Sequence, residues 1–293
     1  MESRTFSMGA NKMENNSDHH DFACRQAQRL SHELQRRFQG KEATLSFIKS
    51  LRRIRLVFLL ALFPVIWVSC FRVDPFHIIQ GSGHIVEEFR KVGQFDRVKV
   101  MGSCKLFIRP GPGGAIRLLG EDNILPFIET AVVNSTLVIG TSNKCSYLTN
   151  VGVEVYVSMN IVRGVSIAGS CIAVGEGRLS ADKLELVIAG SGRIDLDVTA
   201  RDIFSRILGS GTIELHGKCD QHVVEITGSG NMRAFDLQVQ RCDIFISGSG
   251  ECRVFVTRAL DVRISGSATV YYKGRPPLIH LKNTGSGKII ALD

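Results

Sequence analysis

A short Gly-Ser-x motif recurs at nearly constant spacing through the second half of the chain. Its first glycine stands at Gly169, Gly190, Gly209, Gly228, Gly248, Gly266 and Gly285. Successive glycines are separated by 21, 19, 19, 20, 18 and 19 residues, and two earlier copies begin at Gly81 and Gly102. Such a period is typical of proteins that stack one small structural unit many times. A unit of about nineteen residues cannot bury its own apolar side chains, so we expect each unit to pack against its neighbours.

The residues beside the motif predict strands. An isoleucine stands two residues before six of the seven glycines, at Ile167, Ile188, Ile207, Ile226, Ile246 and Ile264. Apolar and polar residues alternate on both sides, as in RIDLDV at 193–198, and this period of two indicates a strand with one buried face. Glycine readily adopts the positive φ of a sharp bend. We therefore expect strand, bend and strand in each unit, with the glycines as structural repeat corners.

Stacking such units predicts an all-β fold, a single-stranded right-handed parallel β-helix with Gly-Ser-Gly repeats of about nineteen residues. The handedness follows the general preference of parallel crossovers. The isoleucines then form a column in the core, where each buried side chain contributes about 1.5–3 kcal/mol. The corner serines form a column of hydroxyl groups at the bends.

The corners do not resemble nucleotide-binding loops. No GxxxxGK[ST] sequence occurs, and GxGxxG fails at every corner. A nucleophilic serine needs a histidine partner, but His216, His222 and His280 lie at no constant distance from a corner. We therefore assign no catalytic residue and no cofactor.

The repeat also suggests how the chain is divided. We expect one β-helix head domain over 71–293, with regular repeats over 161–293. The segment 79–160 lacks corners over much of its length but still alternates, so we expect less regular coils there, with a short helical turn near Leu125.

An apolar run, LVFLLALFPVIWV, extends over Leu56–Val68. Only sixteen residues separate Arg55 from Arg72, fewer than the about twenty that a membrane-spanning helix needs. Basic residues before a short apolar run are typical of a secretory signal. Cys70 follows this run after a serine, which resembles the lipobox of bacterial lipoproteins, although Trp67 stands where leucine is usual. We expect lipidation at Cys70; simple secretion and a retained anchor are the alternatives.

The segment 51–70 is thus predicted to be a signal or lipoprotein segment, preceded by a polar preface at 1–50. Either the preface is disordered and cytoplasmic, as the positive-inside rule places it, or translation starts downstream near Leu51. The chain carries a formal charge of +8, but +5 of it lies before residue 56. The remaining basic residues are dispersed, so we expect no nucleic-acid partner.

The eight cysteines include no CxxC and no Cys/His pair at zinc-ligand spacing, so we expect no metal site. Cys242 and Cys252 are expected to be buried on strands. Cys104 and Cys171 each take the third position of a corner. If those corners stack, the coil spacing of about 4.8 Å is compatible with a disulfide between them.

The corners, together with GEDNILPFI at 120–128 and YKGRP at 272–276, resemble the head GIN domain family, which is described as auto-transporter adhesins of Bacteroidetes-type bacteria. The likeness extends over 79–293. It implies a right-handed β-helix in the cell envelope and supplies no catalytic or binding residues.

The chain departs from the family's pattern where a third corner glycine is usual. Cys104, Cys171 and Ala268 stand there, which leaves the local turn geometry open.

These observations favour a non-enzymatic β-solenoid of the cell envelope, an adhesin or scaffold tethered through Cys70 as an outer-membrane lipoprotein, or located in the periplasm or at the cell surface. Its expected partners are the membrane and a glycan or another envelope protein. One alternative is a polysaccharide lyase or hydrolase, whose carboxylates would be Asp195 and Asp197 on one strand face and Glu214 one coil further on. The other is a membrane-anchored protein associated with signalling, with 1–50 in the cytoplasm.

Overall fold

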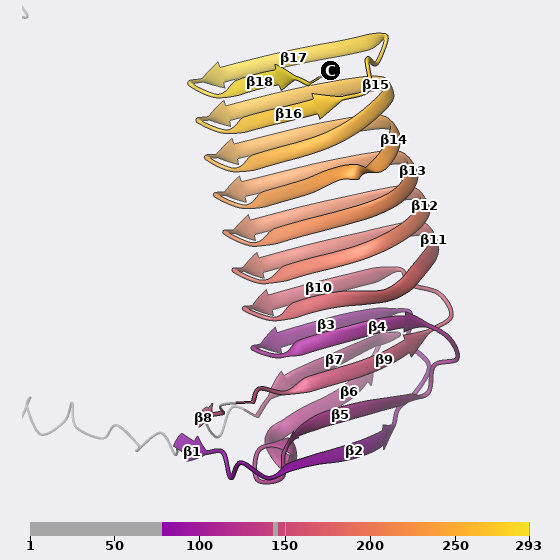
Figure 1. Ribbon diagram of the computed structural model, residues 1–293, viewed down its shortest axis with the longest axis vertical. Coiled ribbons are helices and arrows are strands. Elements are labelled where there is room, and N and C mark those ends of the chain that lie inside the picture. Colours follow the sequence, from indigo (N-terminus) through magenta and orange to yellow (C-terminus); the bar gives the residue numbers. More distant parts are fainter. Residues whose placement is uncertain (1–77, 143–145, 150, 293) are drawn as a thin grey trace, which may run out of the picture. The chain divides into compact units, whose positions relative to one another are not determined.

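A computed structural model describes residues 78–142, 146–149 and 151–292, most of which lie in β-strands. Figure 1 shows these strands stacked into successive coils. Within these ranges, no helix has the length and apolar character needed to cross a membrane. The polar preface, the signal segment and Cys70 lie outside the described residues.

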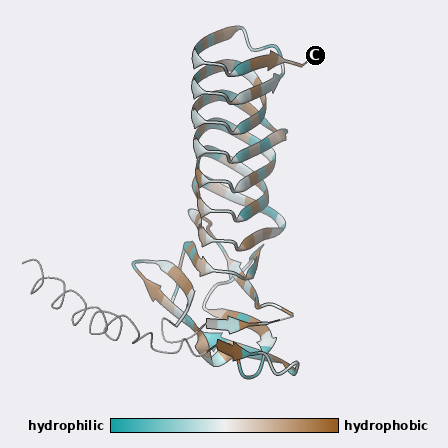
Figure 2. Cartoon of the chain, turned by 90° about the vertical axis from the view of Figure 1, so that its left-hand side faces the viewer, coloured by the Kyte–Doolittle hydropathy of each residue, from teal (hydrophilic) through white to brown (hydrophobic). Residues whose placement is uncertain are grey.

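Five long strands each make one complete coil between two corners. They are β11 (Ile172–Gly190), β12 (Arg193–Gly209), β13 (Thr212–Gly228), β14 (Asn231–Gly248) and β15 (Glu251–Gly266). Each pairs in parallel with the next, so that equivalent residues of neighbouring coils are aligned. Figure 2 shows polar and apolar residues alternating along these coils. The predicted parallel β-solenoid is confirmed.

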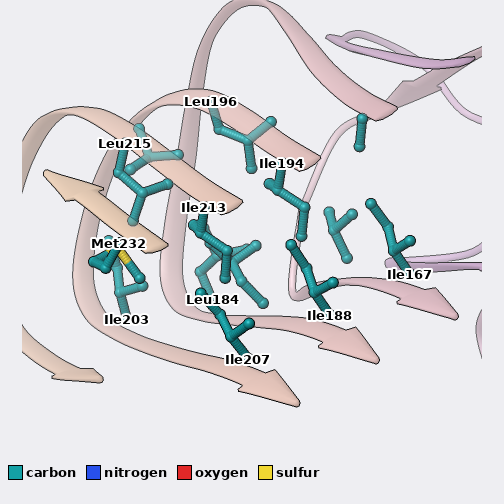
Figure 3. Packing of buried hydrophobic residues seen from close by; sticks show 14 of the residues in the cluster. Ile167, Leu184, Ile188, Ile194, Leu196, Ile203, Ile207, Ile213, Leu215 and Met232 are labelled. Carbon is teal, nitrogen blue, oxygen red and sulfur yellow. The ribbon is translucent and has the colours of Figure 1, made fainter. Parts of the chain in front are cut away.

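The isoleucines before the corners form the predicted column. Ile188 pairs with Ile207, Ile207 with Ile226, and the alignment continues from Ile167 to Ile264. All six side chains are at most 3% exposed. Figure 3 shows Ile167, Ile188 and Ile207 side by side in the core. Like side chains therefore meet from coil to coil, and one packing solution is repeated.

Glycine is required at the corners for two reasons. Gly209 has a φ of 125°, a backbone conformation that residues with a Cβ atom rarely adopt. A Cβ atom there would also lie 2.6 Å from the carbonyl oxygen of Gly190 in the preceding coil. The backbone N–H of Ser210 donates to that same oxygen at 3.0 Å. The hydrogen bonds that join successive corners thus come from the backbone, while the Ser210 hydroxyl belongs to an exposed residue. Gly285, at the last corner, lies outside the positive-φ region.

The part of the solenoid before the regular repeats contains shorter elements. These are β1 (Ile78–Gln80), β2 (Ile85–Lys91), β3 (Arg97–Gly102), β4 (Lys105–Pro110), β5 (Ala115–Glu121), the 3-10 helix η1 (Leu125–Phe127), β6 (Ile128–Val133), β7 (Thr136–Thr141), β8 (Ser146–Leu148), β9 (Glu154–Met159) and β10 (Gly164–Gly169). The helical turn expected near Leu125 is present as η1.

Less regular coils were expected here, and β3, β4, β7, β9 and β10 do pair in parallel. In contrast, β5 runs antiparallel to β9, β2 antiparallel to β5, and β6 antiparallel to β7. A parallel coil leaves unpaired backbone groups at its outer edge. The antiparallel strands occupy those edges on β9 and β7, and so they cover the first coils of the solenoid.

The other end of the solenoid is formed by β16 (Thr269–Lys273), β17 (Leu278–Gly285) and β18 (Lys288–Ala291). β17 stacks on β15 and β18 on β16. Every residue of β17 is exposed, including Leu278 at 68%. Within the described residues, therefore, no further strand covers this last coil.

The core column makes a prediction about stability. Replacing Ile207 with alanine should leave a cavity between two coils and lower the free energy of unfolding by about 3 kcal/mol, measured by urea denaturation. The matched control is Leu208→Ala one residue later, because Leu208 is 44% exposed and its loss should change stability by about 0.5 kcal/mol or less. Equal effects of the two substitutions would contradict the packing described.

Candidate binding groove

A groove of about 1550 Å³ runs across the coils at the bends that lie midway between corners. It is lined by successive coils, chiefly by residues 180–185 of β11, 199–204 of β12, 218–221 of β13, Gln238 and Gln240 of β14, and Thr257 of β15, with Arg97, Ile161 and Arg163 at its β3 and β10 end. Aligned positions of β11, β12 and β13 line the groove because these strands pair in register. The groove therefore extends from coil to coil, although the side chains at the aligned positions differ.

Small side chains account for the hollow. Ala181 pairs with Ala200, which pairs with Cys219 on the next coil. Ala200 is 8% exposed and Cys219 is also buried, whereas Thr199 and Arg201 beside Ala200 are exposed. The small side chains at the buried positions therefore leave a hollow between the longer, exposed side chains on either side of them.

Cys219 does not supply reactive chemistry to the groove. Its Sγ donates a hydrogen bond to the carbonyl oxygen of Gln221 at 2.8 Å. Burial raises the pKa of the Cys219 thiol to about 12, so it stays protonated at neutral pH. A protonated thiol is neither a good nucleophile nor a metal ligand.

The charges along the groove are largely compensated within it. Arg201 lies 3.3 Å from Asp182 and 3.2 Å from Asp202. Arg97 contacts Glu185 at 2.6 Å. On the next coils the lining includes Gln221, Gln238 and Gln240, and Gln240 donates to Asp220. The lining also carries Lys183 and Lys218, which form no ion pair within the described residues. Its five basic and four acidic side chains nearly balance, and together with the amides this suits a polar ligand without strong net charge.

The carboxylates considered for glycan cleavage lie outside this groove and are engaged in ion pairs. Arg193 contacts both Asp195, at 3.3 Å, and Glu214 on the next coil. Arg178 donates to both carboxylate oxygens of Asp197, at 2.9 and 3.1 Å. The bidentate pair thus engages both carboxylate oxygens of Asp197. In the residues that the structure describes, no group of three His, Cys, Asp or Glu side chains could hold a metal ion.

A serine–histidine pair is present, which the sequence reasoning missed. Ser205 Oγ lies 2.9 Å from His222 Nε2, but both residues are 0% exposed and no substrate can reach them. The available signal was Ser205 itself, a polar residue four positions before a corner where Leu186 and Val224 occupy the neighbouring coils. A buried hydroxyl at an apolar position requires a partner.

The burial of His222 is energetically unfavourable. Burial lowers the pKa of its imidazole to about 3, and Nδ1 has no hydrogen-bond partner among the described residues. The pair is a structural feature of the core, and it makes the fold sensitive to acid.

Comparison with known proteins identifies relatives of the chain. Residues 94–276 match the family model described as "Putative auto-transporter adhesin, head GIN domain", which confirms the resemblance found in the sequence. A search of curated proteins finds no match.

Several solved structures share the fold. A putative adhesin from Bacteroides fragilis is 23% identical with a TM-score of 0.69, and covers 73% of this chain and 100% of its own. A putative lipid binding protein from Parabacteroides distasonis is 24% identical with a TM-score of 0.64, at 73% and 99% coverage. A putative adhesin from Parabacteroides merdae is 20% identical with a TM-score of 0.61, at the same coverage.

The buried histidine predicts a pH dependence of stability. As pH falls below 6.5, the imidazole takes up a proton in the unfolded chain, whereas in the folded chain it does so only near pH 3. The unfolded state therefore binds more protons, and between pH 7 and pH 5 this residue should lower the free energy of unfolding by about 2 kcal/mol.

Urea denaturation at both pH values measures this loss. The control combines Ser205→Val with His222→Leu, which places apolar residues at positions aligned with Val224 and Ile203 on neighbouring coils. The double variant should lose about 2 kcal/mol less than the parent between pH 7 and pH 5. An equal loss in both proteins would show that His222 does not cause the dependence.

Proposed function

We propose that this chain, which belongs to the family of putative auto-transporter adhesins with a head GIN domain, is a non-enzymatic adhesin of the cell envelope that binds a neutral glycan in the groove of its solenoid. The groove across β11–β15 is the observation that carries this proposal. Its length follows from coil stacking, so it is suited to an extended polymer rather than to a compact small molecule.

The chemistry of the lining favours an uncharged sugar chain. Hydroxyl groups of sugars bond to amides such as those of Gln221 and Gln238, and to ion-paired groups such as Arg201. A strongly charged polymer would have to disrupt the ion pairs of Arg97 and Arg201, and it would find only Lys183 and Lys218 on the lining without an acidic partner among the described residues. Repetition along the coils allows several weak contacts to act together on one polymer.

The groove has few aromatic side chains, with Phe204 as the one on its lining. The Arg206 guanidinium lies over the Phe204 ring at 4.9 Å from the centroid. Stacking on sugar rings therefore adds little to binding here. We infer that each sugar is bound weakly and that affinity grows with the length of the glycan.

We further propose that the head domain is held at the envelope by lipid on Cys70. This rests on the apolar run, its basic residues and the cysteine that follows them. A single acyl chain gives only marginal membrane binding, so several chains on Cys70, as lipoprotein chemistry implies, would provide a stable anchor. The adhesin would then remain attached while its groove engages a glycan outside the cytoplasm.

A binding experiment tests the groove. The full-length chain is titrated by calorimetry with dextran and mannan as neutral glycans and with polygalacturonate as an acidic one. We expect binding to the neutral group, little change between about 0.05 and 0.5 M salt because no net charge is neutralised, and an affinity about tenfold lower after Gln238→Ala, as expected for one lost hydrogen bond.

Asn231→Ala is the matched control, because it removes an amide from the same strand, β14, outside the groove. It should leave the affinity unchanged. Binding restricted to the acidic polymer, or an equal loss in both variants, would contradict the proposal. Release of reducing ends that disappears in Asp195→Asn would instead establish the polysaccharide-cleaving alternative.

The lipid anchor is tested in cells grown with a palmitate analogue. The parent chain should incorporate the label and sediment with membranes, and Cys70→Ser should lose the label because the acylated thiol is absent. Labelling that persists in Cys70→Ser would contradict lipidation at this residue. Retention of the unlabelled variant in membranes would indicate an uncleaved anchor, which is the arrangement that the signalling alternative requires.

A further inference from the structure

Two cysteines meet where the first coils join the regular repeats. Cys104 lies between β3 and β4, and Cys171 lies between β10 and β11. Each follows a Gly-Ser pair at a corner, and the two corners are stacked directly on one another. Their sulfur atoms are 3.2 Å apart.

Backbone hydrogen bonds hold these two corners in register. The N–H of Ser170 donates to the carbonyl oxygen of Gly102 at 3.0 Å, and the N–H of Ile172 donates to that of Cys104 at 3.0 Å. Aligned residues on neighbouring parallel strands lie about 4.8 Å apart. This spacing falls within the range of Cα separations that disulfides span, about 4.4–6.8 Å.

The other corners show why a cysteine at the third corner position is unusual. A Cβ atom at Gly192 would lie 2.7 Å from Ile167 Cγ2, and one at Gly211 would lie 2.6 Å from Ile188 Cγ2. The third corner position therefore favours glycine. Apart from the methyl group of Ala268, side chains replace that glycine at two consecutive stacked corners, and both of them are cysteines.

The remaining cysteines in the described ranges have no such partner. Cys219 is aligned with Ala200 and Val239, Cys242 with His222 and Leu260, and Cys252 with Met232 and Val270. The alignment of Cys104 with Cys171 is thus a specific feature of one corner pair.

We propose that Cys104 and Cys171 form a disulfide that closes the segment 105–170 and joins the first coils to the regular repeats. This segment includes the antiparallel strands β5 and β6, whose contacts do not follow the repeat. It also includes Arg163, at one end of the groove. The cross-link fixes this segment against β11 whether or not the groove binds a glycan.

The oxidant is the disulfide of an exported thiol–disulfide oxidoreductase. Cys104 is half-buried and Cys171 fully buried, so the oxidant reaches Cys104 first, although the hydrogen bond between the two thiols raises the pKa of Cys104 and lowers the pKa of Cys171. Its thiol loses a proton, and the thiolate attacks one sulfur of the oxidant, forming a mixed disulfide and releasing the other sulfur as a thiolate. Cys171 then loses its proton and attacks Cys104 Sγ, which expels the second thiolate. Two thiols of this chain become one disulfide, and the oxidant's disulfide becomes two thiols after taking up the two protons.

Mass spectrometry of the full-length chain tests the cross-link directly. Cells are quenched with acid, and free thiols are then alkylated in denaturant, so that buried thiols react as well. Trypsin cleavage after lysine and arginine places Cys104 in the peptide 100–105 and Cys171 in the peptide 164–178, each with a single cysteine. We expect these two peptides to be joined. Alkylation of both, or a link from Cys104 to Cys145, would overturn the proposal.

A stability measurement provides a second test. Closing a loop of this length should raise the Tm by about 8 °C or more, so a reductant should lower the Tm of the parent by that amount. The variant Cys104→Ala with Cys171→Ala should show no response to reductant, and Cys242→Ala should respond like the parent. A parent Tm that does not change with reductant would contradict the cross-link. If the double variant does not fold, the peptide analysis decides alone.

Discussion

The backbone hydrogen bonds between parallel strands, which return to the same register at every corner despite local bulges, are the interaction on which the rest of this structure depends. Because β12 and β13 align residue by residue, Ile207 lies on Ile226 and Gly209 on Gly228. A slip of one residue would turn every buried side chain to the solvent face. The corner glycines help to prevent that slip, since a Cβ atom at Gly209 would strike the coil before it. Register, core packing and the choice of glycine are thus consequences of one geometric requirement.

The regular coils could be predicted because their contacts repeat. Ile188 is buried by Ile207, a copy of itself one period away, so spacing along the chain reveals spacing in space. The antiparallel direction of β5 and β6 could not be predicted in this way. It depends on pairing with β9 and β7, and no repeated motif in the sequence indicates that pairing. The groove was missed for a different reason. It arises from small side chains such as Ala200 at the bends. The corner motifs and the outward carboxylates, which are the conspicuous features of the sequence, do not indicate these positions.

Polar residues form ion pairs on the surface of the solenoid and a hydrogen bond in its core. On the outside, Arg178 pairs with Asp197, and Arg193 pairs with Asp195 on its own coil and with Glu214 on the next. In the core, Ser205 and His222 satisfy one another in part and gain no access to solvent. The groove across β11–β15 is open to solvent, with paired charges on β11 and β12 and amides on β13 and β14. The family to which the chain belongs is described as putative adhesins.

The exposed last coil, formed by β17 and β18, has a consequence for how such proteins vary. A barrel must close on itself, so its strand number sets its diameter, whereas this solenoid ends without closure. The middle coils contact only their neighbours, as β12 and β13 do. Duplication or loss of a single coil would therefore change the reach of the molecule by about 4.8 Å and leave every other contact in place. Evolution can therefore change the length of such a solenoid one coil at a time, and the length of any groove that crosses the coils changes with it.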